Sequence, residues 1–154
     1  MKLGEALAQL KKEKSRLARL ISLRKDNIYV EKGKKTPFDP SKLGKDIEDK
    51  IEEIRKLKVD VQRTNLNTLF ENNISLAEAI IKVNDIRSKI AWLSGLFNEK
   101  REYSFRLRGK DDIEKVPQLD ESKIEEEMEN LEAEKTKIDN LIQVINWKTE
   151  LMTR

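Results

Sequence analysis

Apolar residues recur every three or four positions along most of this chain, the spacing that places them on one face of an α-helix. The first series predicts a helix over about residues 3–25, and the second predicts a helix over about residues 41–69. Asp39 or Ser41 can cap the free amides of the second helix, and Pro40 suits its first turn. The apolar positions of the two series are Leu3, Leu7, Leu10, Leu17 and Ile21, interrupted at Lys14, and Ile47, Ile51, Ile54, Leu57 and Val61.

The start of the third helix is the best-marked boundary in the sequence. Ser75 is followed three residues later by Glu78, which is a capping box, and residues 72–73 are both Asn, which tolerates a turn. Two further helices are expected, over about residues 75–103 and 120–151. Their apolar positions are Leu76, Ile80, Val83, Ile86, Ile90, Leu93 and Phe97, and then Ile124, Met128, Leu131, Ile138, Ile142, Ile145 and Met152, with Lys135 and Thr149 between them.

These patterns predict an all-α protein, a single domain over residues 1–154 built as an antiparallel four-helix bundle of long, coiled-coil-like helices. The short connection between the second and third helices favours an up-down-up-down order. The second and fourth helices then run in the same direction, so we expect their C-terminal ends to meet at one pole. Both long connections gather at the other pole.

The two long connections, residues 26–39 and 104–119, exceed the usual length of a helix-to-helix loop in a bundle. Each carries a short stretch in which apolar and polar residues alternate, the pattern of a strand. These residues are Ile28 and Val30 in one stretch, and Tyr103, Phe105 and Leu107 in the other. We expect the stretches to pair as a small β-ribbon, or one of them to pair with another subunit.

Composition supports this class of protein. Charged residues make up 40% of the 154 residues, with five Gly and three Pro, which is typical of long helices. Disorder is disfavoured because 32 basic and 29 acidic residues nearly cancel and the apolar pattern is regular. The chain has no Cys, its first twenty residues carry charges throughout, and no window approaches the ~20 apolar residues of a membrane span. We therefore expect a cytoplasmic location.

One polar signature occurs twice, as QRTNLNT at residues 62–68 and as QVINWKT at residues 143–149. In each copy a Gln, an Asn and a Thr follow one another at intervals of three residues, so we place them along one side of a helix, next to the apolar seam. A buried amide requires a partner and thereby fixes how helices pack. The predicted polar packing layer consists of Gln62, Asn65, Thr68, Gln143, Asn146 and Thr149.

Aromatic residues indicate candidate contact surfaces. Trp147 and Trp92 both lie away from the seams of their helices, and large exposed aromatics are favoured as interface anchors. Tyr103 and Phe105 in the second long connection are further candidates. The alternative is that a third helix of the same chain covers the tryptophans. We expect a homo-oligomer on these grounds.

Charge suggests a second hypothesis, nucleic-acid binding. Residues 1–35 carry a net charge of +7, and basic groups interleaved with aromatics can neutralise phosphates and stack bases. Residues 120–140 carry a net charge of −6, so the simpler interpretation is that the basic and the acidic helix are neighbours and neutralise each other. The candidate phosphate contacts are Lys32, Lys34, Lys35, Arg106, Arg108 and Lys110.

Catalytic chemistry has few residues to work with. The chain has no His and no Cys, which removes the commonest general base, the commonest zinc ligands and the thiol nucleophile. Residues 125–129 hold four Glu, but this run is typical of a solvated helix face, because di-iron bundles need Glu-x-x-His pairs. Gly33 and Gly109 stand alone, without a phosphate-binding loop around them. We expect no enzyme activity, no cofactor and no metal.

Three stretches, NIYVEKGKKTPFDP, QRTNLNTLFENNISLAEAI and QVINWKTEL, resemble the small bacterial helical proteins described as septicolysin-like. The likeness extends over most of the chain and is most specific at residues 63–65 and 146–147, whereas residues 104–119 depart from it. The resemblance implies a long-helix, oligomer-forming cytoplasmic protein without an assigned cofactor. The family name suggests a membrane-active cytolysin, but lysines such as Lys14 and Lys135 interrupt the apolar seams.

The sequence therefore predicts a non-enzymatic, self-associating helical protein with a structural or interaction role. The alternative is a nucleic-acid-binding module that uses the basic loops, and a cytolysin-type protein comes third.

Overall fold

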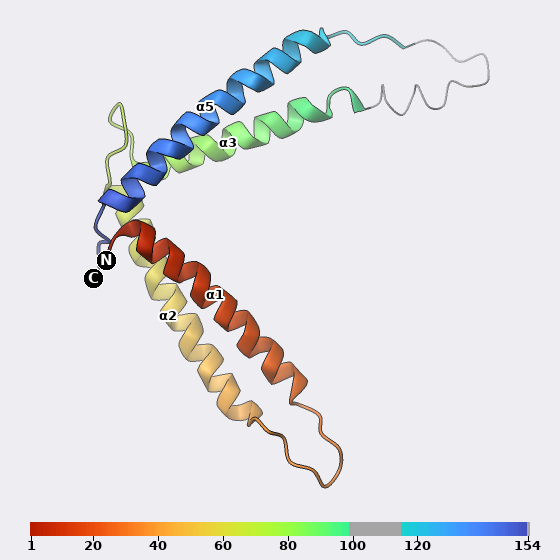
Figure 1. The fold of residues 1–154 in the computed structure, drawn as a ribbon, viewed down its shortest axis with the longest axis vertical. Coiled ribbons are helices and arrows are strands. Elements are labelled where there is room, and N and C mark those ends of the chain that lie inside the picture. The colour runs from red at the N-terminus through yellow and green to blue at the C-terminus, as the bar shows by residue number, and fades with distance from the viewer. Residues whose placement is uncertain (99–114, 154) are drawn as a thin grey trace, which may run out of the picture. The chain divides into compact units, whose positions relative to one another are not determined.

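The computed structural model describes residues 1–98 and 115–153 of the chain (Figure 1). The described helices are α1 (Leu3–Asp26), α2 (Pro40–Asn67), α3 (Leu76–Gly95) and α5 (Glu121–Lys148). They pack antiparallel in pairs, and within the described residues there is no strand beyond two isolated bridges. The prediction of an all-α, antiparallel four-helix fold is confirmed.

Most helix boundaries lie within three residues of those predicted. Asp39 is the N-cap of α2, and its carboxylate accepts a hydrogen bond from the Ser41 N–H (2.9 Å). The prediction is wrong at the end of the third helix, because α3 ends at Gly95 and not near residue 103. There the Leu96 N–H donates to the Leu93 carbonyl (3.2 Å), a tighter turn than that of an α-helix. Residues 99–114 lie outside the described residues.

The described chain divides into two compact units. Unit 1 consists of residues 1–77 and 143–154 and contains α1, α2 and the last turns of α5. Unit 2 consists of residues 78–142 and contains nearly all of α3 and the rest of α5. Each unit is compact by itself, and the single domain over residues 1–154 stays a prediction.

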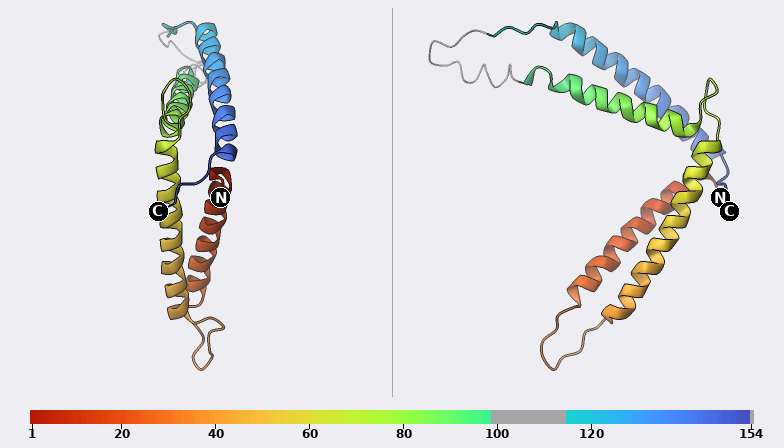
Figure 2. Two further views of the ribbon diagram at one scale, coloured as in Figure 1. Left: turned by 90° about the vertical axis from the view of Figure 1, so that its left-hand side faces the viewer. Right: turned by 180° about the vertical axis from the view of Figure 1, so that it is seen from behind.

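Unit 1 is built on the antiparallel hairpin of α1 and α2, which lie side by side in all views (Figure 2). Of the five seam positions predicted for α2, Ile47, Ile54 and Val61 are buried and Leu57 is half-buried. The seam of α1 is less regular, because two of its buried positions are Ala6 and Glu13. The buried apolar residues of unit 1 are Leu3, Ala6, Leu43, Ile47, Ile54, Val61 and Leu76.

Three residues assigned to these seams from the sequence are exposed. Leu7 and Ile21 of α1 are 36% and 49% exposed, and Ile51 of α2 is 49% exposed. The reason is that α1 turns the Ala6 and Glu13 side towards α2, so the flank carrying Leu7 and Ile21 lies beside the contact. This hairpin thus leaves part of its apolar surface uncovered.

A tight turn joins α2 to α3. Asn72 and Asn73 have φ angles of 52° and 63°, and the Ile74 N–H donates to the Glu71 carbonyl (3.1 Å). Positive φ at both central residues defines a type I′ turn, for which Asn is favoured because it tolerates the left-handed region. The connection therefore reverses the chain between residues 69 and 75, which form an isolated antiparallel bridge.

Unit 2 is a second antiparallel hairpin, formed by α3 and α5. Its buried apolar residues are Ala79, Val83, Ile86, Ile138 and Ile142. Ion pairs flank this seam on the surface and join the helices, namely Lys82–Glu134 (3.0 Å), Arg87–Asp139 (3.0 Å) and Lys89–Glu127 (2.8 Å). Such exposed pairs each contribute about 0.2–1 kcal/mol, so apolar burial holds this hairpin together.

The connection of residues 27–39 forms an irregular loop, and Ile28 and Val30 are exposed in it. Asn27 ties the loop to α1, because its amide donates to the Leu23 carbonyl (2.8 Å) while its Oδ1 accepts from Thr36 (2.9 Å). The loop contains no strand, so this half of the predicted β-ribbon is wrong. The other half, at residues 103–107, lies outside the described residues.

Candidate functional site

The end of α2 presents three polar residues to the interior of unit 1. Thr64 is fully buried, and its hydroxyl donates to the Asp60 carbonyl (2.7 Å) and accepts from the Met152 N–H (2.9 Å). Asn65 is 7% exposed, and the half-buried Thr68 donates from its hydroxyl to the Thr64 carbonyl (2.7 Å). Thr64 therefore joins α2 to the C-terminal segment, a role that the sequence pattern did not indicate.

The end of α5 meets the start of α1 in the same unit. The Leu3 N–H donates to the Thr149 carbonyl (2.9 Å), and the Leu151 N–H donates to the Met1 carbonyl (2.8 Å). Lys2 forms an ion pair with Glu150 beside these bonds, and the hydrogen bond from Lys2 lowers the pKa of the Glu150 carboxyl. This short antiparallel contact fixes the last turn of α5 against α1.

Trp147 packs over Gly4 at this contact. A Cβ atom at position 4 would lie 2.8 Å from Trp147 Cδ2, which is too close for any side chain. Gly4 is thus required where the indole crosses α1, and Trp147 still exposes 56% of its surface. The predicted alternative was that another helix of the chain covers this tryptophan. Helix α1 covers one side of the Trp147 ring at Gly4, and the rest of the ring is exposed.

The predicted polar packing layer is only partly inside. Asn65 and Asn146 are buried, Thr68 and Thr149 are half-buried, and Gln62 and Gln143 are exposed. The prediction is wrong for the two glutamines. Three residues turn a helix by about 300°, so a side chain three positions before a buried Asn lies about 60° further around the axis, which brings each Gln to the surface. The role of the other four residues in helix packing stays a prediction.

Asn65 and Asn146 share an unusual property. Their Oδ1 atoms are buried, and neither accepts a hydrogen bond from the described residues. Leaving a buried amide oxygen without a donor costs about 1–3 kcal/mol. These two oxygens therefore lower the stability of the unit that holds them.

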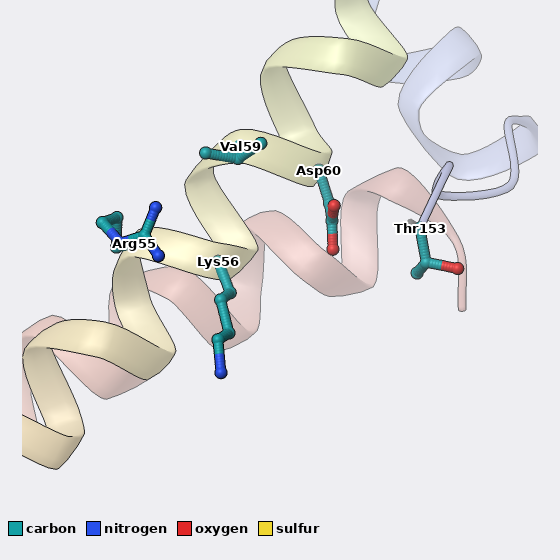
Figure 3. Close-up of a pocket in the computed structure, with 5 residues that line it drawn as sticks. All are labelled: Arg55, Lys56, Val59, Asp60 and Thr153. Atoms are coloured by element: carbon teal, nitrogen blue, oxygen red, sulfur yellow. The ribbon is translucent and has the colours of Figure 1, made fainter.

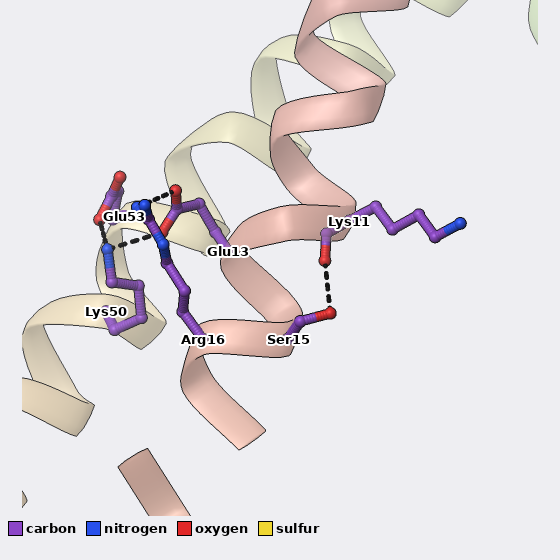
Figure 4. A network of polar contacts seen from close by, with 6 residues as sticks. All are labelled: Lys11, Glu13, Ser15, Arg16, Lys50 and Glu53. Atoms are coloured by element: carbon purple, nitrogen blue, oxygen red, sulfur yellow. Dashed lines mark hydrogen bonds and ion pairs between the residues drawn. The ribbon is translucent and has the colours of Figure 1, made fainter. Parts of the chain in front are cut away.

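A buried carboxylate lies in the seam between α1 and α2 (Figure 4). Glu13 is 4% exposed and accepts hydrogen bonds from Lys50 (2.8 Å) and Arg16 (2.9 Å). The hydrogen bond from Lys50 lowers the pKa of Glu13, although burial acts in the opposite direction. Hydrogen bonds to Glu13 and Glu53 raise the pKa of Lys50. The Glu13–Lys50 ion pair joins α1 to α2 at one register of the hairpin. The apolar pattern of the sequence did not indicate it.

A cavity of about 340 Å³ lies between α2 and the C-terminal segment (Figure 3). Its lining residues are Arg55, Lys56, Val59, Asp60 and Thr153. Arg55 is held by a two-pronged hydrogen bond to Glu52 (2.7 and 2.6 Å), and Lys56 lies 3.8 Å from the same carboxylate. The cavity is thus close to electrically balanced and favours no charged ligand.

The remaining predicted contact residues differ in their surroundings. Trp92 is 71% exposed on α3, while Tyr103 and Phe105 lie outside the described residues. The loop of residues 27–39 contains the predicted phosphate contacts Lys32, Lys34 and Lys35. All three are exposed, and Lys34 forms an ion pair with Glu31. The other predicted phosphate contacts, Arg106, Arg108 and Lys110, lie outside the described residues. Their role, like that of the aromatics, stays a prediction.

The described residues contain no metal-binding cluster and no membrane-spanning helix. No group of three or more His, Cys, Asp or Glu residues within 1–98 and 115–153 is arranged to hold a metal ion. Over the same residues, none of the helices is both long and apolar enough to cross a membrane.

The fold and the contacts define an all-α protein of two antiparallel helical hairpins. The chain belongs to a family of unknown function (DUF6847), whose model matches residues 9–151. It is also similar to a solved structure, a functionally unknown conserved protein from Corynebacterium diphtheriae, with 28% sequence identity, a TM-score of 0.89 and coverage of 99% of each chain. No match is found among the curated proteins.

Proposed function

We propose that this protein is a non-enzymatic helical protein that acts by associating with further copies of itself. The observation that carries this proposal is the exposure of large apolar side chains on helix faces that point away from the hairpin seams. On α3, Trp92 is 71% exposed and Ile81 is 59% exposed. Large exposed apolar residues that recur along one helix face are typical of a protein contact site.

The magnitude of this surface supports a multi-residue contact. Burying the exposed part of Trp92 contributes on the order of 4 kcal/mol, taking roughly 150 Å² at about 25 cal/mol per Å². Association costs an estimated 4–15 kcal/mol in lost freedom, so one tryptophan is insufficient. Further apolar area comes from the exposed Ile81 on α3, from Leu96 just past the end of α3, and from Leu7 and Ile21 on α1.

The non-enzymatic part of the proposal rests on the chemistry of the chain. His and Cys are absent from its 154 residues, and ion pairs already engage carboxylates such as Glu13 and Asp139. The resemblance to septicolysin-like proteins belongs to the proposal as its finer family assignment. The exposed apolar side chains on the helices support the oligomer formation that this resemblance implies.

Light scattering after size exclusion tests the proposal. We expect the wild type at tens of micromolar to show a mass above the 18.0 kDa of one chain, and Ile81→Gln with Trp92→Gln to lower that mass. Tyr29→Gln is a matched control, because Tyr29 is 90% exposed but lies in the loop and not on a helix face. A wild type that stays at the mass of one chain contradicts the proposal.

Nucleic-acid binding is the second candidate function. It is favoured by unit 1, which holds 20 basic and 13 acidic residues, a net charge of +7, and by the exposed lysines at residues 32–35. This function requires an affinity for labelled duplex that falls steeply with salt and is reduced when these lysines are replaced by Gln. Binding that is absent at low ionic strength removes this candidate.

A further inference from the structure

Two exposed strips, one in each unit, have the same residue spacing over their first four positions. The α1 strip lies on the flank beside the hairpin seam, and the α3 strip lies on the face opposite α5. Both follow helical spacing, at intervals of three or four residues. The α1 strip consists of Leu7, Lys11, Lys14, Ala18 and Ile21, and the α3 strip consists of Ile81, Asp85, Ser88 and Trp92, with Leu96 just past the end of α3.

We propose that the α3 strip of one copy packs on the α1 strip of a second copy, with the two helices parallel. This inference rests on the proposed self-association and names its contact. The spacing agrees over the first four positions of each strip, because Leu7 to Ala18 and Ile81 to Trp92 both cover eleven residues, about 16–17 Å at 1.5 Å per residue. The four-residue step from Leu7 to Lys11 equals the step from Ile81 to Asp85.

In this register Trp92 meets the smallest side chain of the α1 strip. Ala18 lies eleven residues after Leu7, as Trp92 lies eleven residues after Ile81. Ala18 is at one end of a shallow groove of about 500 Å³, whose lining residues are Leu7, Leu10, Lys11, Lys14, Ser15 and Ala18. A cavity of about 150 Å³ accepts a benzene ring, so this groove has room for an indole. The lysines at its rim can also interact with the ring face.

Charge favours the same partner. The side chains of Lys11, Lys14 and Asp85 form no ion pair with the described residues, and the register brings Lys11 next to Asp85. Unit 1 has a net charge of +7 and unit 2, with 12 basic and 16 acidic residues, has a net charge of −4, although the acidic excess of unit 2 lies on α5 and not on α3. Opposite net charges favour the encounter of unit 1 of one copy with unit 2 of another, and the pairing of Lys11 with Asp85 is what selects the α3 strip.

Disulfide trapping tests the contact, because the natural chain has no cysteine. Lys14 and Ser88 face each other in the proposed register, and neither belongs to the Lys11–Asp85 pair. We expect a mixture of Lys14→Cys and Ser88→Cys chains to form a disulfide-linked heterodimer under mild oxidation. Glu126→Cys is the matched control for Ser88→Cys, since Glu126 is exposed on α5 outside the strip.

Three outcomes overturn the inference. The first is that Glu126→Cys traps Lys14→Cys as efficiently as Ser88→Cys does. The second is that the Ser88→Cys mixture gives no heterodimer while the wild type still associates. The third is that a chain carrying both Lys14→Cys and Ser88→Cys closes mainly within itself, which would mean that one chain covers its own strip. A monomeric wild type would instead refute the proposed function itself, so the two failures are distinguishable.

Charge exchange tests the parallel direction, in which Lys11 meets Asp85. We expect Lys11→Glu alone and Asp85→Lys alone each to weaken association by about fivefold, and the two together in one chain to restore it. Trp92→Ala should weaken association by at least about tenfold, as expected of an aromatic anchor. Losses that simply multiply in the double variant would exclude the pairing of Lys11 with Asp85.

Discussion

Thr64 and Asn65 are adjacent, polar and buried, yet the structure predicts that removing their polar groups has opposite effects on stability. The Thr64 hydroxyl makes two hydrogen bonds, at 2.7 Å to the Asp60 carbonyl and at 2.9 Å from the Met152 N–H. The Asn65 Oδ1 is buried and accepts none from the described residues. Thr64→Val and Asn65→Leu keep the approximate shape of each side chain, so they isolate the polar term.

The expected magnitudes follow from these contacts. Thr64→Val deprives the Met152 N–H of its acceptor and should lower the free energy of unfolding by about 1–2 kcal/mol. Asn65→Leu removes a buried acceptor that has no donor and should raise the free energy of unfolding by about 1–2 kcal/mol. Asn146→Leu should act in the same direction as Asn65→Leu, because its Oδ1 has the same property.

Urea unfolding followed by circular dichroism at a fixed protein concentration measures these differences. The concentration must be fixed because self-association adds to apparent stability. With a typical urea dependence of 1–3 kcal/mol per molar, each substitution should move the midpoint by roughly 0.5 M, in opposite directions. A lower midpoint for Asn65→Leu would refute the reasoning, since it would mean that the Asn65 oxygen has a partner. An unchanged midpoint for Thr64→Val would refute the stabilising role of the hydrogen bond from the Met152 N–H to Thr64.

Three further predictions concern other parts of the chain. The hydrogen bond from Lys50 lowers the pKa of Glu13, so Glu13 stabilises the fold above the usual pKa of a glutamate, and this contribution is lost as the pH falls through the lowered pKa. Glu13→Gln should therefore weaken the fall of the melting temperature at acid pH, whereas the control Glu48→Gln, at an exposed position, should not. Gly4→Ala should displace the Trp147 ring, shift its fluorescence to longer wavelength and cost about 1–3 kcal/mol, and unchanged emission would contradict the contact. Replacing the lysines at residues 32–35 by Gln should leave the mass in solution unchanged.

The sequence predicts the helices well because each one carries its own local signals. Asp39 and Pro40 mark the start of α2, and the positive φ angles of Asn72 and Asn73 bear out the turn expected there. The seam of α1 was predicted less well, since Ala6 is a small apolar residue outside the series of larger ones and Glu13 is charged. Glu13 can be buried only because Lys50 lies opposite it on α2, and such a tertiary partner cannot be inferred from one helix.

The candidate site was predictable to a similar degree. The repeated Asn marked the two buried amides, because an isolated polar residue beside an apolar seam is visible in the sequence. Spacing by three made the glutamines look equivalent, although rotation around the helix carries Gln62 and Gln143 to the surface. Thr64 was missed because its importance comes from Met152, which is 88 residues away in the chain. The sequence pattern already placed Trp92 away from the seam of its helix, whereas the exposure of Ile81 on the same face was seen only in the structure.

Sedimentation equilibrium of the wild-type chain tests the central claim, self-association, most directly. Across protein concentrations from below one to tens of micromolar, we expect a mass that rises from the 18.0 kDa of one chain towards a multiple of it. The Trp92→Ala chain should need a higher concentration to reach the same mass. A wild-type mass equal to that of one chain at every concentration would contradict the account.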